Sequence, residues 1–459
     1  MSTKASSRSS TITDSSVDAD VLRYTVGEDP VLDLELAVWD CMGTAAHVTM
    51  LSEMRLKRPV VTKPEAAAVR RELGKIAELA QSGRFSIRPE DQDVHMAVER
   101  MLTERLGDLG KKIHTGRSRN DQVAVDTRLH IKDSLLKTEL EIVNLAAALC
   151  RLGRRGAEIP LVGRTHLQPA MPSTVEMWAT GHAEMLLDQI ENCEAAYRLA
   201  DANPLGSAAG YGVPLPLDRA RTTRLMGFSR TIHNCFGASM ARGECESALL
   251  SALAQTMVVL SRLAEDLILF SMPEFAYFRL PREFCTGSSI MPQKYNPDVL
   301  ELVRAKAAAV IGMQTASLTL THAMPGGYNR DLQDTKGLYM KGLDATRTTL
   351  RILAKVADGV KVDAERCRAA FSPGVFATDV ALRMVAKGVP WRDAYHDVRD
   401  HLERLSSESP DDAVCAKTHE GTTGGIDRGV YRMRMAAAAK SAKARLAALA
   451  AKRSALLKG

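Results

Sequence analysis

The clearest pattern in the chain is a recurrence of apolar residues at steps of three and four positions, which places them on one face of an α-helix. The pattern covers residues 121–151 without a glycine or proline and returns over 244–272. Two further stretches, around 174–201 and 298–322, complete at least four predicted long helices. At 1.5 Å per residue, the helix over 244–272 would be roughly 40 Å long.

Apolar residues on the helix over 244–272 also lie outside its main stripe. A helix that is apolar on more than one side packs on more than one side. The pattern therefore favours a helical bundle that buries further surface in an oligomer, with a large monomeric helical core as the alternative. Strand patterns are almost absent, so we expect an all-α fold.

The predicted elements divide the chain into a leader and three helical domains. The leader is rich in Ser and Thr and is predicted to be disordered. The first domain contains an apolar helical pattern over 32–54, and the last consists of shorter helices that end in an Ala/Lys/Arg-rich amphipathic helix over 433–458. The expected boundaries are 1–20 for the leader, 21–118 for the N-terminal helical domain, 119–365 for the central bundle and 366–459 for the C-terminal helical domain.

Composition narrows the class of protein. Hydrophobic residues make up 45% of the 459 residues and charged residues 25%, which is typical of a soluble globular protein. The net charge of +6 is spread along the chain with no basic stripe among aromatics, which weakly favours small anionic substrates and argues against nucleic acid.

The eight cysteines are far apart and form no CxxC pair, which excludes a zinc-ligand pattern and favours a reducing cytoplasm. No apolar run predicts a signal peptide or a membrane span, so we expect a soluble cytoplasmic protein without membrane or nucleic-acid partners.

Polar residues gather in four segments that interrupt the helical pattern. The first is HTGRSRNDQ, residues 114–122, directly before a long predicted helix. It presents Ser118, Arg119, Asn120 and backbone N–H groups near the positive end of that helix, an arrangement suited to carboxylate binding. A capping loop with solvated arginines is the alternative for any one of these residues alone.

The second segment is GRTHLQP, residues 163–169, in which we expect Thr165 and His166 to lie just before a helix whose start Pro169 restricts. His166 could act as a general acid or base, or form part of a proton relay. A structural role is the more common one for a single histidine.

The third segment, residues 287–298, combines one glycine and two prolines with Ser288, Lys294 and Asn296. A turn-rich connector would not need a serine pair, an ammonium and an amide in one short loop. The fourth segment, residues 326–336, is expected to place its polar side chains on a loop and the first turns of a helix, where a solvated helix start is an equal alternative. Those side chains are Tyr328, Gln333 and Lys336.

The third segment, continued to Glu301, resembles the signature of the fumarase, aspartase and argininosuccinate lyase superfamily: Gly-Ser-Ser, then Pro, Lys and Asn at fixed spacing, then Glu. The runs HTGRSRNDQ, THLQPA and YNRDLQ resemble argininosuccinate lyases in particular, as do PLGSAAG at 204–210 and the segment 377–390. The resemblance covers about residues 24–403. It implies a helical three-domain subunit whose central helices assemble a homotetramer, with each active site built from three subunits.

The resemblance also implies roles for individual residues. Ser288 matches the family's catalytic base, Lys294 and Asn296 match residues that hold the substrate carboxylate, and His166 paired with Glu301 matches the histidine associated with protonating the leaving group. The remaining expected substrate-binding residues are Asp33, Ser118, Arg119, Asn120, Thr165, Tyr328, Gln333 and Lys336. The implied reaction is reversible elimination of argininosuccinate to arginine and fumarate, for which no metal or organic cofactor is expected.

Three positions differ from the commonest family pattern. Tyr295 stands where these lyases usually have Lys, Asp29 stands where a Ser usually contacts the amino-acid end, and the segment around Arg242 is also unusual. The last two changes concern the leaving group more than the chemistry. The alternatives are therefore a lyase for another N-succinyl compound and an inactive structural paralogue; a nucleic-acid-binding helical protein is a more distant third.

Overall fold

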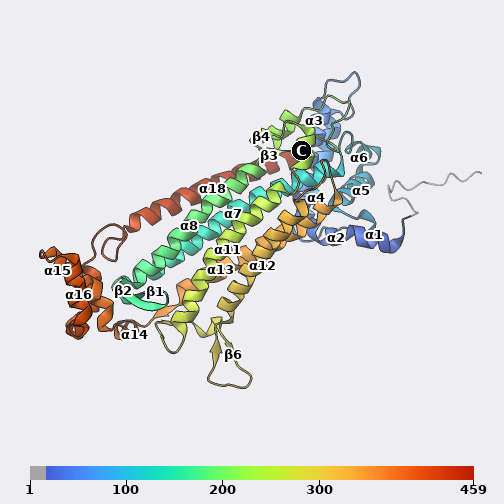
Figure 1. Cartoon of the computed structure of the whole chain (residues 1–459). Coiled ribbons are helices and arrows are strands. Elements are labelled where there is room, and N and C mark those ends of the chain that lie inside the picture. The colour runs from blue at the N-terminus through green and yellow to red at the C-terminus, as the bar shows by residue number, and fades with distance from the viewer. Residues whose placement is uncertain (1–16, 459) are drawn as a thin grey trace, which may run out of the picture. The chain divides into compact units, whose positions relative to one another are not determined.

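The computed structural model describes residues 17–458, and helices dominate it (Figure 1). Of the predicted leader over 1–20, residues 1–16 lie outside the described part, and the first helix already begins at Ala19. Contacts divide the chain into two compact units, which are described separately. Unit 1 comprises the described residues up to His130, Asn203–Ser239 and the chain end from Lys452; unit 2 comprises Ile131–Ala202 and Met240–Ala451. The expected three-domain division stays a prediction.

Short and medium helices build unit 1. In α4 the first turn is fixed by a capping box, in which Thr62 accepts from the backbone N–H of Glu65 and the Glu65 carboxylate accepts from Thr62. The elements are α1 Ala19–Val26, α2 Asp29–Leu32, η1 Asp33–Glu35, α3 Ala37–Glu53, α4 Lys63–Gln81, η2 Pro89–Asp91, α5 Val94–Leu106, α6 Asp108–Lys112, α9 Arg219–Met226, β4 Arg230–Thr231 and α10 Cys235–Met240.

Long helices build unit 2, and Figure 1 shows them as rods that run side by side. They are α7 Arg119–Arg155, which begins in unit 1, α8 Val175–Ala200, α11 Glu244–Ser271, α12 Asp298–Thr321, α13 Asp334–Gly359 and α18 Arg428–Leu457, which ends in unit 1. The four long helices predicted from apolar spacing are confirmed, and their bounds shift by no more than a few residues. Leucines and alanines on facing sides of these rods form one continuous core.

One of these rods, α11, has the length and apolar composition of a membrane span. The rest of the structure buries 67% of its most apolar window, however. A helix buried in this way is the central helix of the bundle, which agrees with the apolar residues found outside its main stripe.

The strands are short, but more of the chain forms strands than the sequence pattern predicted. Among the described residues they form four two-stranded sheets: β1 Pro160–Thr165 with β2 Gln168–Thr174, β3 Ala202–Asn203 with β4, β5 Phe278–Arg279 with β8 Lys361–Val362, and β6 Thr286–Gly287 with β7 Tyr295–Asn296. The expectation that Thr165 and His166 lie directly before a helix was wrong. They lie at the end of the β1–β2 hairpin, and the helix begins only at Val175.

Shorter helices follow β8, as predicted, and connect to the long α18. They are α14 Ala364–Ala369, η5 Pro373–Phe376, α15 Ala377–Ala386, α16 Trp391–Asp400, η6 Leu402–Ser407 and α17 Pro410–Cys415, with a small apolar core of their own. Both η5 and α17 pack against β2, and Lys417 donates to the backbone carbonyl of Pro172 at 2.7 Å. These elements therefore support the β1–β2 hairpin. All eight cysteines are free thiols.

Candidate active site

A hairpin holds the serine pair of the third polar segment. Strand β6 pairs with β7 in the register Thr286 opposite Asn296 and Gly287 opposite Tyr295, so that Ser288 opens the connecting loop. The hairpin projects from the end of the rods (Figure 1). A loop held at both ends by a strand pair keeps its polar groups in a defined place while leaving them accessible.

The hydroxyl oxygen of Ser288 accepts two backbone hydrogen bonds from its own loop. The donors are the N–H groups of Ile290, at 3.3 Å, and Met291, at 3.0 Å. Lys294 closes the loop through its backbone N–H, which donates to the carbonyl of Met291 at 3.0 Å. Two N–H dipoles directed at one oxygen stabilise negative charge on it, which is what a serine needs in order to act as a base.

The other polar side chains of this region lie close in sequence but face solvent. The Lys294 side chain is exposed, Asn296 is half-buried on β7, and Glu301 is exposed on the first turn of α12. An ammonium and an amide on the same hairpin as Ser288 can contact one carboxylate. The positive end of the α12 dipole lies beside them.

His166 and Leu167 form the tip of the β1–β2 hairpin, and both have left-handed backbone conformations, with φ of 52° and 61°. Such angles cost energy in residues other than glycine, and they cluster at functional sites. The close strand pairing needs Gly163, because a Cβ there would lie 2.9 Å from the carbonyl oxygen of Met171. Thr165 and His166 are both exposed.

Arg164 anchors this hairpin to the segment that follows α11. Its guanidinium donates to the carbonyl of Leu167 at 3.0 Å and to the hydroxyl of Tyr277 at 3.4 Å, and it lies 4.8 Å from the ring centre of Phe275. The hairpins of His166 and Ser288 therefore lie at the same end of unit 2. In this chain the expected pairing of His166 with Glu301 is not formed among the described residues.

Tyr328, Gln333 and Lys336 lie at the opposite end of the same rods. Gln333 ends the short helix η4 Arg330–Gln333, and Lys336 is in the first turn of α13. A Cβ built on Gly243, at the start of α11, would lie 2.5 Å from Thr321 and 3.1 Å from Leu332, so η4 packs where α12 ends and α11 begins.

Lys336 is only 2% exposed, so the alternative of a solvated helix start is wrong at this position. Helix α12 has 24 residues, and at 1.5 Å per residue a helix of that length spans about 35 Å. Ser288 lies before its first turn and Lys336 beyond its last one. These two residues of one chain cannot contact the same small molecule.

The remaining predicted residues belong to unit 1, at the start of α7. The hydroxyl of Ser118 accepts from the backbone N–H of Asn120 at 3.2 Å, and the Ser118 N–H donates to Asp121 at 2.9 Å. Arg119 is exposed and donates to the carboxylate of Asp93. Ser118 thus directly precedes α7, and Arg119 and Asn120 are its first two residues, at the positive end of its dipole.

Asp33 lies in the same unit and is buried, and its carboxylate accepts from the backbone N–H of Val94 at 3.2 Å. His114, at the start of the HTGRSRNDQ segment, has its pKa lowered to about 4 by burial and by the nearby charge of Arg117. A neutral His114 leaves the guanidinium groups as the positive charges of this segment.

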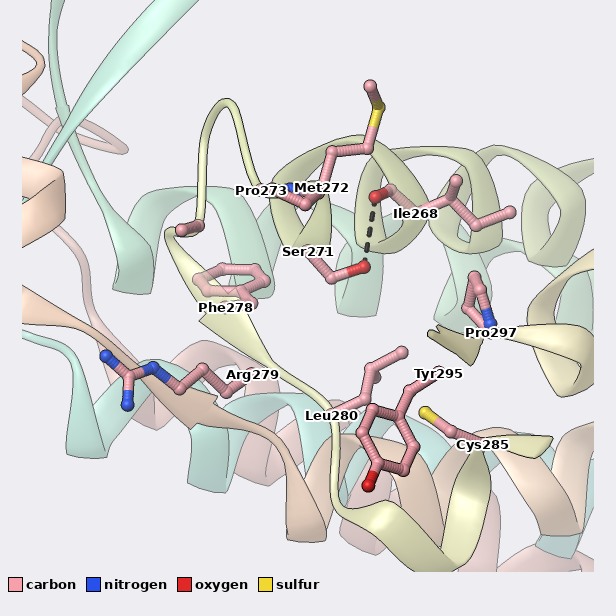
Figure 2. A pocket seen from close by; sticks show the side chains of 11 residues that line it. Ile268, Ser271, Met272, Pro273, Phe278, Arg279, Leu280, Cys285, Tyr295 and Pro297 are labelled. Carbon is pink, nitrogen blue, oxygen red and sulfur yellow. Dashed lines mark hydrogen bonds between the residues drawn. The ribbon is translucent and has the colours of Figure 1, made fainter. Parts of the chain in front are cut away.

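A cavity of about 300 Å³ lies between the end of α11 and the base of the β6–β7 hairpin, and Figure 2 shows the side chains that line it. Its wall is mostly apolar and includes Ile268, Phe278 and Leu280, with Cys285 and Tyr295 from the base of the hairpin. None of the predicted site residues lines it. Arg279 is the one charged residue among the described residues that line it.

The sequence reasoning missed a buried polar cluster in unit 1. Asp40, His95 and Asp126 lie on three different helices, with ligand-type atoms within 4.8 Å of one another. One signal could have revealed it: Asp40, Thr44 and His47 recur at helical spacing within the otherwise apolar α3.

Comparisons with known proteins identify relatives of this chain. A family model described as Lyase matches residues 15–312. An argininosuccinate lyase of Sorangium cellulosum is 43% identical over 409 residues, which cover 89% of this chain and 94% of that protein. An argininosuccinate lyase of Thermotoga neapolitana is 39% identical and covers 84% and 96%.

Solved structures with the same fold include an EDDS lyase in complex with formate. It has a TM-score of 0.76 and 23% identity over 96% of this chain and 97% of that one. A class II fumarase from Schistosoma mansoni has a TM-score of 0.70 and 15% identity over 85% and 94%. At these identities the structures establish the helical fold.

Proposed function

The chain belongs to the argininosuccinate lyase family, and from this membership we propose that it cleaves argininosuccinate reversibly to arginine and fumarate. The observation that carries the proposal is the Ser288 loop, in which a family signature coincides with a hydroxyl oxygen that accepts two backbone N–H groups.

Ser288 acts as the base. Its oxygen takes the proton from the carbon beside a carboxylate, and the electron pair moves into that carboxylate to give a dianion. A free serine hydroxyl is too weak a base for this step. The N–H groups of Ile290 and Met291 stabilise the negative charge of the serine alkoxide, and the cationic side chains among the substrate-binding residues stabilise it further.

Stabilisation of the dianion is the main catalytic task, because water stabilises such a species poorly. Lys294 and Asn296, on the same hairpin as Ser288, hold the carboxylate that gains charge. Ser118, Arg119, Asn120 and Thr165 bind the fumarate-side carboxylates.

The carbon–nitrogen bond then breaks, the leaving nitrogen takes a proton, and fumarate is released. His166 assists that proton transfer, with Glu301 as its carboxylate partner. Exposure at a strained hairpin tip suits a histidine that must reach into a site formed elsewhere. Asp33, Tyr328, Gln333 and Lys336 bind the rest of the substrate, with Asp29 near its amino-acid end.

The site is completed by other copies of the chain in a homotetramer. The separation of about 35 Å between the two ends of α12 supports the use of more than one copy, because no single chain can bridge it. The surface of α12 supports it. Ile311 and Leu318, which are seven residues apart and so share one face, are 41% and 51% exposed, and no charged residue occurs from 307 to 321. An apolar helix face of this kind fits burial against the same helix of another copy.

The direct test is to incubate the purified protein with argininosuccinate and follow fumarate by its ultraviolet absorbance, with arginine measured in parallel. Equal amounts of both products, formed also in the presence of a chelator, are expected for a cofactor-free cytoplasmic enzyme. A panel of other N-succinyl amines is assayed beside it. Faster turnover of another member would reassign the leaving group, and no fumarate from any of them would contradict the proposal.

A further inference from the structure

Three helices of unit 1 bring an acid–base cluster together in a fully buried place. Nδ1 of His95, on α5, lies 2.6 Å from Oδ2 of Asp40, on α3, and 3.6 Å from Oδ2 of Asp126, on α7. None of the three side chains exceeds 6% exposure. A charge is kept at such depth only when it is paired.

The charges in this cluster follow from their surroundings. Burial raises the pKa of Asp126 well above its usual range, and the negative charge of Asp40 raises it further, which favours the protonated form of Asp126. Burial alone would lower the pKa of His95, but the hydrogen bond with Asp40 and the charge of Asp93 outweigh it, and the net shift is upward. Both shifts favour the protonated forms of His95 and Asp126, beside the side chain of Asp40.

The residues on either side of this cluster contact the predicted substrate-binding groups. Helix α5 begins with Val94, whose N–H donates to Asp33 at 3.2 Å, and its N-cap Asp93 accepts from Arg119. Three consecutive residues at the start of α5 therefore make these contacts. Asp93 contacts Arg119, Val94 contacts Asp33, and His95 contacts Asp40.

A second connection runs through α3. The hydroxyl of Thr44 accepts from the guanidinium of Arg117 at 2.8 Å and lies 3.5 Å from the Asp40 carboxylate. Arg117 is itself buried and directly precedes residues 118–120. The Asp40 carboxylate is thus linked to the predicted anion-binding region in two ways: through the start of α5 and through Arg117.

We propose that the buried His95–Asp40 ion pair is a positioning device for substrate binding: it fixes the start of α5 and the segment 117–120 so that Asp33 and Arg119 face the substrate. The inference rests on the proposed function. Neither residue touches the substrate, and both act through the groups they hold.

A metal ion is the competing occupant, since a histidine and two carboxylates are ordinary ligands. In a tetrahedral zinc site, ligand atoms about 2.0–2.2 Å from the ion lie roughly 3.3–3.5 Å from each other. The 2.6 Å separation of His95 and Asp40 is instead that of a charge-assisted hydrogen bond. The buried guanidinium of Arg117 also opposes a divalent cation.

The pH dependence follows from the direction of the His95 shift. The imidazolium is lost as the pH rises through the raised pKa of His95, so substrate affinity should weaken on the alkaline side. The ionisable groups around the His95–Asp40 pair are Asp33 of η1, Asp93 at the N-cap of α5, Glu99 of α5, His114 and Arg117 of the segment before α7, and Asp126 of α7.

The experiment compares the full-length wild type with His95→Gln, which keeps an N–H donor toward Asp40, and His95→Leu, which keeps none. We expect KM for argininosuccinate to rise roughly tenfold in His95→Leu and less in His95→Gln, with a smaller change in kcat. The alkaline rise in KM should be absent from both. Val69→Ala, a buried apolar truncation on α4, is the control for lost stability alone and should leave KM unchanged.

Wild-type turnover tests the function, and a second measurement tests the inference without turnover. Amide hydrogen exchange over 93–94 and 117–120 should accelerate in His95→Leu relative to the rest of unit 1, and no such local change should occur in Val69→Ala. If His95→Leu does not fold, Asp40→Asn is used in its place. Unchanged KM and exchange in the folded variants, or zinc binding by the wild type that His95→Gln abolishes, would overturn the proposal.

Discussion

The hydroxyl oxygen of Ser288 accepts a hydrogen bond from the backbone N–H of Met291, three residues further along its own loop. The geometry is local, because both groups belong to the turn that joins β6 and β7. The stabilisation of the serine oxygen is therefore already present in the single chain, before any partner completes the site. This distinguishes Ser288 from the adjacent Ser289, for which no such hydrogen bond is found among the described residues.

The first prediction concerns Ser288→Ala. The change removes the base and leaves the carboxylate contacts, so kcat should fall by at least about a thousandfold while substrate affinity stays near that of the wild type. Stopped assays of fumarate release and equilibrium binding of argininosuccinate measure the two quantities. Ser289→Ala is the matched control on the same loop and should retain most of the turnover; equal losses in both variants would mean that the base has been assigned to the wrong serine.

The second prediction concerns the ammonium of Lys294. Because that group stabilises charge that develops during proton removal, Lys294→Gln should lower kcat by about 100- to 1000-fold and raise KM less. Lys306→Gln is the control, since Lys306 is also an exposed lysine but lies two turns into α12. Steady-state kinetics of both variants suffice. A loss confined to KM would show that Lys294 binds the ground state without assisting the chemistry.

Much of the fold could be predicted from the sequence, because long helices leave a regular apolar spacing. The spacing located α7, α8, α11 and α12 to within a few residues. The β1–β2 hairpin could not be found in this way. Its tip consists of His166 and Leu167, which have left-handed backbone angles that their residue types do not signal, and its strands lack the alternation of a half-buried sheet.

The candidate site, like the fold, could be predicted from the sequence only in part. Motif spacing selected residues such as Ser288 and Arg119, since these occur in short polar segments between helices. It could not reveal that Ser288 and Lys336 lie at opposite ends of α12, which is a property of how the rods pack. It also missed Asp40 and His95, because a buried charge inside an apolar helix looks like a single exception until its partner on another helix is known.

The third prediction tests the protonation of Asp126 through stability. A carboxyl whose pKa is raised on folding keeps its proton in the folded state while the unfolded chain releases it, so the protein loses stability as the pH rises above about 4. Asp126→Asn cannot titrate and should raise Tm, more at pH 8 than at pH 5. A gain of 1 kcal/mol corresponds to about 2–4 °C in a domain of 150–250 residues.

The matched control for this measurement is Asp133→Asn, on the same helix, where the carboxylate pairs with Lys137. No pH-dependent gain is expected from it, because an accessible ion pair contributes little. A drop in Tm for Asp126→Asn at both pH values would mean that Asp126 is ionised in the folded protein, and the charge assignment of the cluster would have to change.

The last prediction tests whether each site combines residues from different chains. Ser288→Ala and Lys336→Gln should each be nearly inactive alone, because the first lacks the base and the second a substrate contact. In one chain the two positions are separated by the length of α12, about 35 Å, so a working site must take them from different copies. If the two variants are unfolded, mixed in equal amounts and refolded together, each site draws its Ser288 loop and its Lys336 independently. About half of the loops and half of the lysines are intact, so roughly a quarter of wild-type activity should return in a closed symmetric oligomer.

Each parent refolded by itself is the control and should stay inactive. A mixture that remains as inactive as its parents, with mixed oligomers demonstrated by mass, would require both residues of a site to come from one chain, which the length of α12 does not allow, or would remove one of them from the site.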